Sequence, residues 1–133
     1  MIDVEKKVFK IVRDGIKTEY PNIRVYSEYI RTPKVFPCIM VEEIDTQTYL
    51  KSQDTNSVEN HIIVSYQVDI YDDGENKKSS VKALASTIND LFIGLKFSRV
   101  FGNKISNEDD DNIYRYTMRF TAVIGSDDYV YSI

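Results

Sequence analysis

The chain has 133 residues and a formal net charge of −4, with 42% hydrophobic and 29% charged residues. This length fits one domain, and the apolar content suits a packed core rather than a disordered chain. No run approaches the roughly 18 apolar residues of a membrane span, and the acidic balance disfavours a general nucleic-acid binder because phosphates are repelled. The N-terminus has no basic segment followed by an apolar one, which predicts no signal peptide and a cytoplasmic protein.

The first predicted element is a helix from Val4 to Thr18. Asp3 is a suitable N-cap residue, and Pro21 ends the helix because proline disfavours helix in the residue before it. Apolar residues at helical spacing predict one buried stripe. That stripe consists of Val4, Val8, Ile11, Val12 and Ile16. A short strand from Ile23 to Ile30 is expected next.

A connector with two prolines, residues 31–37, leads into a predicted strand from Cys38 to Asp45. The mostly polar stretch from Thr46 to Asn60 predicts a long hairpin arm between two antiparallel strands. Arms of this length are uncommon in compact domains and are often functional. Tyr49 and Leu50 are its large apolar side chains up to residue 57, so we expect them to contact a partner or a neighbouring subunit.

The clearest strand pattern runs from His61 to Tyr71, where apolar and polar residues alternate as in a strand with one buried face. The buried face is predicted to hold Ile62, Val64, Tyr66, Val68 and Ile70. After a turn, a helix is predicted from Lys77 to Phe92, with Gly94 placed to stop it. Its stripe is typical of a helix lying on a sheet. The stripe consists of Val81, Leu84, Ala85, Ile88, Leu91, Phe92 and Leu95.

A short strand is predicted from Phe97 to Phe101, and a polar loop from Gly102 to Asn112. The last major strand is predicted from Ile113 to Ile124. One of its faces holds Tyr114, Tyr116, Met118, Phe120, Ala122 and Ile124, and the other holds Arg115, Thr117, Arg119 and Thr121. The tail, residues 126–133, carries Tyr129 and Tyr131 and is too apolar to lie in water without a partner.

The order of elements is one helix, about three strands, a second helix, and one or two strands. Two apolar helix stripes are both satisfied when the helices pack on one face of a mainly antiparallel sheet. The predicted class is therefore α/β of the α+β kind, as a single domain spanning residues 1–133.

The sequence contains no serine-nucleophile elbow and no glycine-rich phosphate loop. Cys38 is the only cysteine, so no internal disulfide forms. Within the run Cys38-Ile39-Met40-Val41 it is interpreted as a small buried hydrophobe. As a nucleophile it would need His61 as its base, and nothing in their spacing recommends that pair. We therefore predict that the protein is not an enzyme.

The four consecutive acids Glu108, Asp109, Asp110 and Asp111 are the candidate cation site of the sequence. A calcium loop needs alternating oxygen ligands around a glycine, which this stretch does not offer. One histidine and one cysteine do not make a usual zinc site. The acids are interpreted as a solvated loop, and no metal or cofactor is predicted.

Aromatic residues recur along the last strand at Tyr114, Tyr116 and Phe120, a pattern that can stack nucleic-acid bases. The acidic balance and the need to cover the helices favour a core role for this face. On the opposite face, Arg115 and Arg119 are predicted to pair with acids of neighbouring strands, Asp69 or Glu43, or with a partner subunit.

From Phe36 to Gly125 the chain resembles phage tail terminator proteins, also called tail completion proteins of the head–tail joint. The resemblance begins with Phe36-Pro37-Cys38-Ile39-Met40-Val41, followed by a polar arm and Val64-Ser65-Tyr66-Gln67-Val68-Asp69-Ile70-Tyr71. A helix and an acidic loop come next. The pattern ends with Ile113-Tyr114-Arg115-Tyr116-Thr117-Met118-Arg119-Phe120-Thr121-Ala122-Val123-Ile124.

The resemblance implies a virion protein whose copies form a ring, usually a hexamer, at the head-proximal end of a tail. Such a ring ends the growth of the tail tube and presents a surface to the head connector or stopper protein, while DNA passes through its lumen without specific binding. The family has no catalytic residues. We hypothesise that Glu108 to Asp111 face the lumen or its rim, and that the arm from Thr46 to Asn60 contacts the tube or a neighbouring subunit.

Three other functions stay open at this point. The first is another ring protein of the head–tail connector, such as a head-completion protein. The second is a small intracellular module that binds a protein or a ligand as a monomer or dimer. An enzyme comes last, because its chemistry would have to come from Cys38, His61 or scattered carboxylates.

Overall fold

The computed structural model describes residues 3–30, 33, 35–48, 61–105, 112–125 and 130–131. Its elements in chain order are α1 (Glu5–Glu19), β1 (Arg24–Tyr26), β2 (Cys38–Thr48), β3 (His61–Asp72), α2 (Lys77–Gly94), β4 (Ser98–Ile105), β5 (Tyr114–Gly125) and β6 (Val130–Tyr131). The strands form one sheet in the order β1-β2-β3-β5-β4, and β6 pairs with the end of β5. Only the β1–β2 pair is parallel among these strands, so the predicted fold class is confirmed.

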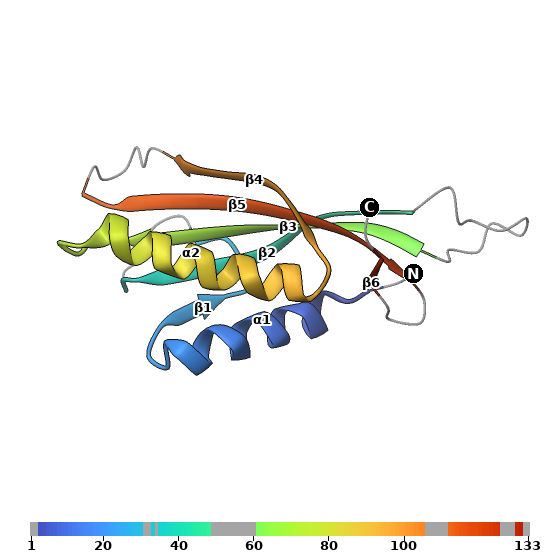
Figure 1. Ribbon diagram of the computed structural model, residues 1–133, viewed down its shortest axis with the longest axis horizontal. Coiled ribbons are helices and arrows are strands. Elements are labelled where there is room, and N and C mark those ends of the chain that lie inside the picture. Colours follow the sequence, from blue (N-terminus) through green and yellow to red (C-terminus); the bar gives the residue numbers. More distant parts are fainter. Residues whose placement is uncertain are drawn as a thin grey trace, which may run out of the picture.

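Both helices lie side by side against the same face of the sheet, as Figure 1 shows for α1 (blue) and α2 (yellow). Between them and the strands lies the main core, which contains the predicted stripe of β3 and the buried residues of both helices. Its aromatic centre is held by Phe92 of α2, whose ring stacks on Phe120 of β5 with the centroids 4.3 Å apart. The face of β5 weighed above as a base-stacking platform is therefore used for packing.

The helix α1 agrees with its prediction to within one residue at each end. Val4, rather than Asp3, occupies the cap position, although Asp3 Oδ1 still accepts a hydrogen bond from the Glu5 backbone nitrogen at 3.2 Å. Ile11 was expected in the buried stripe and is 43% exposed. It lies one residue, about 100° around the helix, from Val12, and the contact face follows the Val8, Val12 and Ile16 row instead.

The strand expected from Ile23 to Ile30 is much shorter, because β1 ends at Tyr26. After Tyr26 the chain leaves the edge of the sheet and crosses the face opposite the helices. The backbone nitrogen of Tyr29 donates to Glu42, and that of Ile30 to the sulfur of Met40, both at 3.2 Å. This segment covers a second, smaller core that consists of Cys38, Met40 and Tyr71, with Tyr26, Ile30, Phe36 and Ile113 around it.

Two strands are longer than predicted. The strand β2 continues to Thr48, three residues into the expected arm, and the rest of that arm lies outside the described residues. The strand β4 begins at Ser98 and continues to Ile105, past Gly102, where a loop was expected. A Cβ atom on Gly102 would lie 3.1 Å from the Tyr116 hydroxyl oxygen, so the glycine leaves room for the Tyr116 side chain against β4.

The helix α2 was predicted to within two residues, but its end differs in detail. Gly94 is the last helical residue and has no positive φ angle. Lys96 adopts the left-handed conformation instead, with φ at 68°, and its backbone nitrogen donates to the carbonyl of Ile93 at 2.9 Å. The chain then turns directly into β4, which places that strand beside α2.

Candidate functional site

A ladder of polar side chains crosses the sheet face opposite the helices. Arg115 Nη2 and Nε lie 2.9 and 3.0 Å from Asp69 Oδ1, and Thr117 donates its hydroxyl to the same oxygen. The Asp69 side chain is only 4% exposed. Burial opposes the charge on Arg115, but Asp69 overcomes that effect, so the pKa of Arg115 is raised. The predicted pairing of Arg115 with Asp69 is confirmed. It engages two of the three guanidinium nitrogens of Arg115 within the chain.

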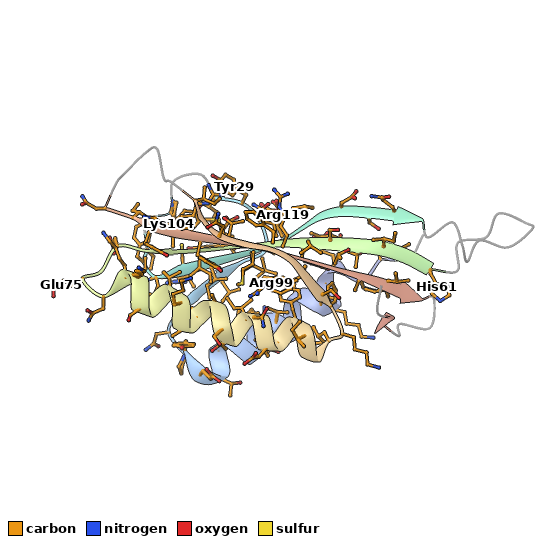
Figure 2. All side chains as sticks on the ribbon, turned by 45° about the horizontal axis from the view of Figure 1, so that its top comes forward. Tyr29, His61, Glu75, Arg99, Lys104 and Arg119 are labelled. Carbon is orange, nitrogen blue, oxygen red and sulfur yellow. The ribbon has the colours of Figure 1, made fainter. Side chains whose placement is uncertain are left out.

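Arg119 is an exposed arginine on this face of the sheet. Its Nε donates to Gln67 Oε1 at 3.0 Å, and its guanidinium carbon lies 5.8 Å from the centre of the Phe101 ring. Figure 2 labels Arg119 and Tyr29 on this side of the sheet. The predicted alternative partner, Glu43, lies on the helix side because it is aligned with the buried Tyr66, so that pairing was wrong.

Cys38 and His61 do not form a catalytic pair. Cys38 is fully buried, and burial, followed by the charge of Asp72, raises the pKa of its thiol to about 12. Cys38 is paired with Tyr71 at one end of β3, whereas His61 begins that strand. At about 3.3 Å per residue, the ten residues between them span roughly 33 Å. Figure 2 shows His61 at one end of the molecule and Glu75, which follows β3, at the other.

An acidic cluster that the sequence pattern did not predict lies where α1 begins against β2. Glu43 is hydrogen-bonded to Glu5, with Asp3 nearby. Burial, that hydrogen bond, and the charges of Glu5 and Asp3 raise the pKa of Glu43 to about 7. The hydroxyl of Tyr66 is buried and has no hydrogen-bond partner in the structure. Burial, and then the charges of the same three acids, raise its pKa.

A cleft of about 420 Å³ opens beside this cluster and is lined by Asp3, Glu5, Lys6, Phe9 and Ser27. One sequence signal was available. Glu42 and Glu43 are consecutive in a strand, so one of the two had to face the helices. Nothing in the pattern indicated that the start of α1 would add two more acids there.

Basic and apolar side chains gather on β4, at the opposite edge of the sheet. Val100 is 63% and Phe101 39% exposed. Edge strands that are protected against pairing with another chain do not usually expose large apolar side chains. Arg99 is exposed and lies with Lys82 around a shallow hollow on the α2 side. Lys104 places its ammonium 5.3 Å from the centre of the Tyr114 ring. Figure 2 labels Arg99 and Lys104 at the two halves of the strand.

Most of the other predicted site residues cannot be placed. Tyr49, Leu50, Tyr129 and the acidic loop Glu108 to Asp111 lie outside the described residues. Tyr131 belongs to β6, whose backbone pairs it with Val123, and its side chain is outside the description. Within the described part of the chain, no three His, Cys, Asp or Glu side chains are arranged to hold a metal ion. None of the helices described has the length and apolar character needed to cross a membrane.

Comparison with known proteins finds this fold in solved structures. No family model matches the sequence, and no curated protein matches it. A chain in the virion of a native gene transfer agent particle shares the fold, with a TM-score of 0.65 and 12% identity. The match covers 89% of this chain and 94% of that one. The predicted likeness to proteins of phage-like particles is thus confirmed at the level of the fold.

A second similar structure is the sheath/tube terminator of an extracellular contractile injection system, PVC, in its extended state. Its TM-score is 0.49 and its identity 10%. The match covers 95% of this chain and 60% of the terminator, so the present chain spans less than two thirds of that protein.

Proposed function

We propose that this protein is a structural component of a phage-like tail. Its copies form a ring, a hexamer in the simplest form, which caps the tail tube, ends tube polymerisation and joins the tube to the head connector or stopper protein. The observation that carries the proposal is the fold shared with a gene transfer agent virion chain across nearly the whole length of both chains. The family resemblance from Phe36 to Gly125 supports the same role.

The chemistry of the described residues favours a structural rather than an enzymatic role. Cys38, the strongest nucleophile in the sequence, is buried, and its raised pKa keeps it protonated. Arg115 is engaged by Asp69 within the chain. The groups that remain accessible are an exposed arginine, two charged strand edges and several exposed apolar side chains, which are typical of protein interfaces.

In this proposal the ring sits at the head-proximal end of the tail, in virions assembled in the host cytoplasm. DNA passes through its lumen without specific binding, consistent with the net charge of −4. The acidic loop from Glu108 to Asp111 faces the lumen or its rim, and the arm from Thr46 to Asn60 contacts the tube or a neighbouring subunit. Both assignments rest on the sequence.

The proposal is tested by deleting the gene in a strain that produces the particle and examining lysates by electron microscopy. We expect tail tubes of uncontrolled length together with heads that carry no tail. Expression of the native chain from a plasmid should restore joined particles with tails of uniform length. If the deletion strain makes tails of normal length attached to heads, the protein does not terminate or join tails.

Two alternatives give different results in the same preparations. A head-completion or other connector protein would be found on tailless heads rather than on headless tubes, which immunogold labelling distinguishes. A small protein-binding module is favoured by an open cleft of about 440 Å³ between the end of α1, the loop before β2 and α2. For such a module we would expect a monomer or dimer absent from purified particles, and tails unaffected by the deletion.

A further inference from the structure

Among the described strands, the sheet ends in two unpaired edges. On one side, β1 pairs with β2 only from Cys38 to Met40, so Val41–Thr48 has no outer neighbour among the described strands. On the other side, β4 pairs with β5 alone within that same set. Unpaired edges offer rows of backbone donors and acceptors that readily add another strand. Neither edge is blunted by a proline in its described strand.

The two edges carry opposite charge. The β4 edge holds Arg99 and Lys104, with Lys96 just before the strand, and within the described residues Arg99 has no acidic partner. The β2 edge holds Glu42, Glu43 and Asp45, next to the acids that begin α1. Each edge also exposes a large apolar side chain at its bulge, Val100 in β4 and Ile44 in β2.

The register of the sheet brings these groups to the same level. Glu43 is opposite Tyr66, Tyr66 is opposite Phe120, and Phe120 is opposite Arg99. Residues directly opposite each other across antiparallel strands share one face. Arg99 and Glu43 therefore end the same row, at opposite edges of the sheet, and both lie on the helix side.

The strand directions also allow the sheet to continue from one copy to the next. Going from β2 through β3 and β5 to β4, each neighbour reverses direction, so β4 runs opposite to β2. If a second copy is placed edge to edge with its helices on the same side, its β2 is antiparallel to the first copy's β4. The β1 strand occupies the rows of Cys38 to Met40 and thereby limits direct pairing to the segment beyond them.

We propose that Ser98–Gly102 of one copy pairs antiparallel with Val41–Asp45 of a second copy, so that Arg99 enters the cleft beside Glu43, Glu5 and Asp3. This proposal rests on the proposed ring and names its subunit contact. The contact is heterologous, because each copy uses its β4 edge toward one neighbour and its β2 edge toward the other. Such contacts generate rings when the rotation between copies closes.

The pairing also gives a role to two features of the single chain, the acidic cluster around Glu43 and the exposed cation Arg99. Burial, and then the neighbouring acids Glu5 and Asp3, raise the pKa of Glu43, and a guanidinium placed beside Glu43 would favour its charged form. Arg99 meanwhile lies beside Lys82, another cation, and the described residues that line this hollow include no acid. A charge pair that becomes desolvated in an interface contributes strongly to affinity and to register.

Charge reversal tests the contact. We expect Arg99→Glu and Glu43→Lys each to weaken association at least tenfold in sedimentation velocity experiments, a change of about 1.4 kcal/mol. The combined variant restores the opposite charges in exchanged positions and should return to within a few-fold of the native affinity. Lys10→Glu, on the exposed side of α1, makes the same charge change as Arg99→Glu away from the edge and serves as the control.

A cysteine pair reports the contact even when association is weak. Ile44→Cys and Val100→Cys place thiols at exposed positions in neighbouring rows of the two edges, while the native Cys38 stays buried. Under mild oxidation the double variant should form covalent trimers and larger ladders, because each copy is linked on both sides. Each single variant should remain free of such ladders.

Four outcomes decide the matter. Rescue by the exchanged pair together with ladders supports the edge contact. Native association beyond a dimer that neither charge variant weakens overturns this contact but leaves the proposed ring standing. Association that stops at a dimer overturns head-to-tail pairing. If the native chain stays monomeric both alone and with the tail tube protein, and no ladders form, the contact and the proposed ring both fail.

Discussion

Glu43 gives the sharpest test of how the acidic cluster acts in the folded chain. Its pKa is raised from 4.5 to about 7, first by burial and then by Glu5 and Asp3. At pH values between 4.5 and about 7, Glu43 therefore binds a proton more readily in the folded protein than in the unfolded chain. By linkage, the free energy of unfolding therefore falls as pH rises from about 4.5 to about 7, and the penalty is fully present above that range.

The magnitude follows from the pKa difference. A rise from 4.5 to about 7 is a difference of about 2.5, which at about 1.4 kcal/mol for each pKa unit gives a ceiling of about 3.5 kcal/mol. Glu43 is only partly buried, so solvent screening reduces this value, and we expect about 1–2 kcal/mol. Glu43→Gln keeps the size and the hydrogen-bonding capacity of the side chain but cannot ionise.

The assay is urea unfolding of the native chain and of Glu43→Gln at pH 5 and at pH 8.5. The variant should gain about 1–2 kcal/mol over the native chain on going from the lower to the higher pH. Glu5→Gln removes the neighbouring charge and should act in the same direction. Glu28→Gln, at an exposed position after β1, is the control and should show no such gain.

The reasoning is refuted if the difference in unfolding free energy between Glu43→Gln and the native chain is the same at both pH values. That result would mean that Glu43 ionises in the folded protein as easily as in the unfolded chain. The acidic cluster would then be a fully solvated surface, and its proposed use as a seat for Arg99 would lose its electrostatic support.

Two further predictions concern the opposite face of the sheet. Asp69→Ala should lower the free energy of unfolding by about 3 kcal/mol in chemical denaturation, because it leaves the charge of Arg115 uncompensated. Adding Arg115→Met should recover much of that loss. Equal stabilities for the single and double variants would contradict this. Cys38 should resist alkylation by iodoacetamide at pH 8 while the protein is folded, and it should react readily in urea. The reason is that its thiol is buried and burial raises its pKa to about 12. Fast reaction of the folded chain would contradict this burial.

Strong periodicity allowed β3 and α2 to be predicted from the sequence with nearly correct ends. In both, apolar residues recur with the period of the element because one face packs on the core. The β4 strand was cut short because Gly102-Asn103-Lys104 has the composition of a turn. Its extended backbone comes from pairing with β5, residue by residue down to Arg115, and local sequence does not report that pairing.

In the candidate site, too, contacts set by strand alternation were predictable and contacts set by tertiary packing were not. The partner of Arg115 was predictable, because alternation alone put Asp69 and Arg115 on one face of adjacent strands. The cluster around Glu43 depends on where α1 docks on β2, two elements separated by eighteen residues. Helix docking is a property of the whole core, so strand alternation indicated one acid on the helix side of β2 but not the two acids that the start of α1 adds.

The pairing of the strands has a consequence for how the chain folds. The β2–β3 and β4–β5 pairs each join strands that are neighbours in the sequence, so each can form locally. The β3–β5 ladder, with twelve aligned residue pairs, joins segments about fifty residues apart and closes the loop that contains α2. Because such non-local pairing is slow, docking of the two hairpins is expected to limit the folding rate. Until that docking occurs, the row that ends in Arg99 and Glu43 does not exist, which delays self-association of the edges until the chain has folded.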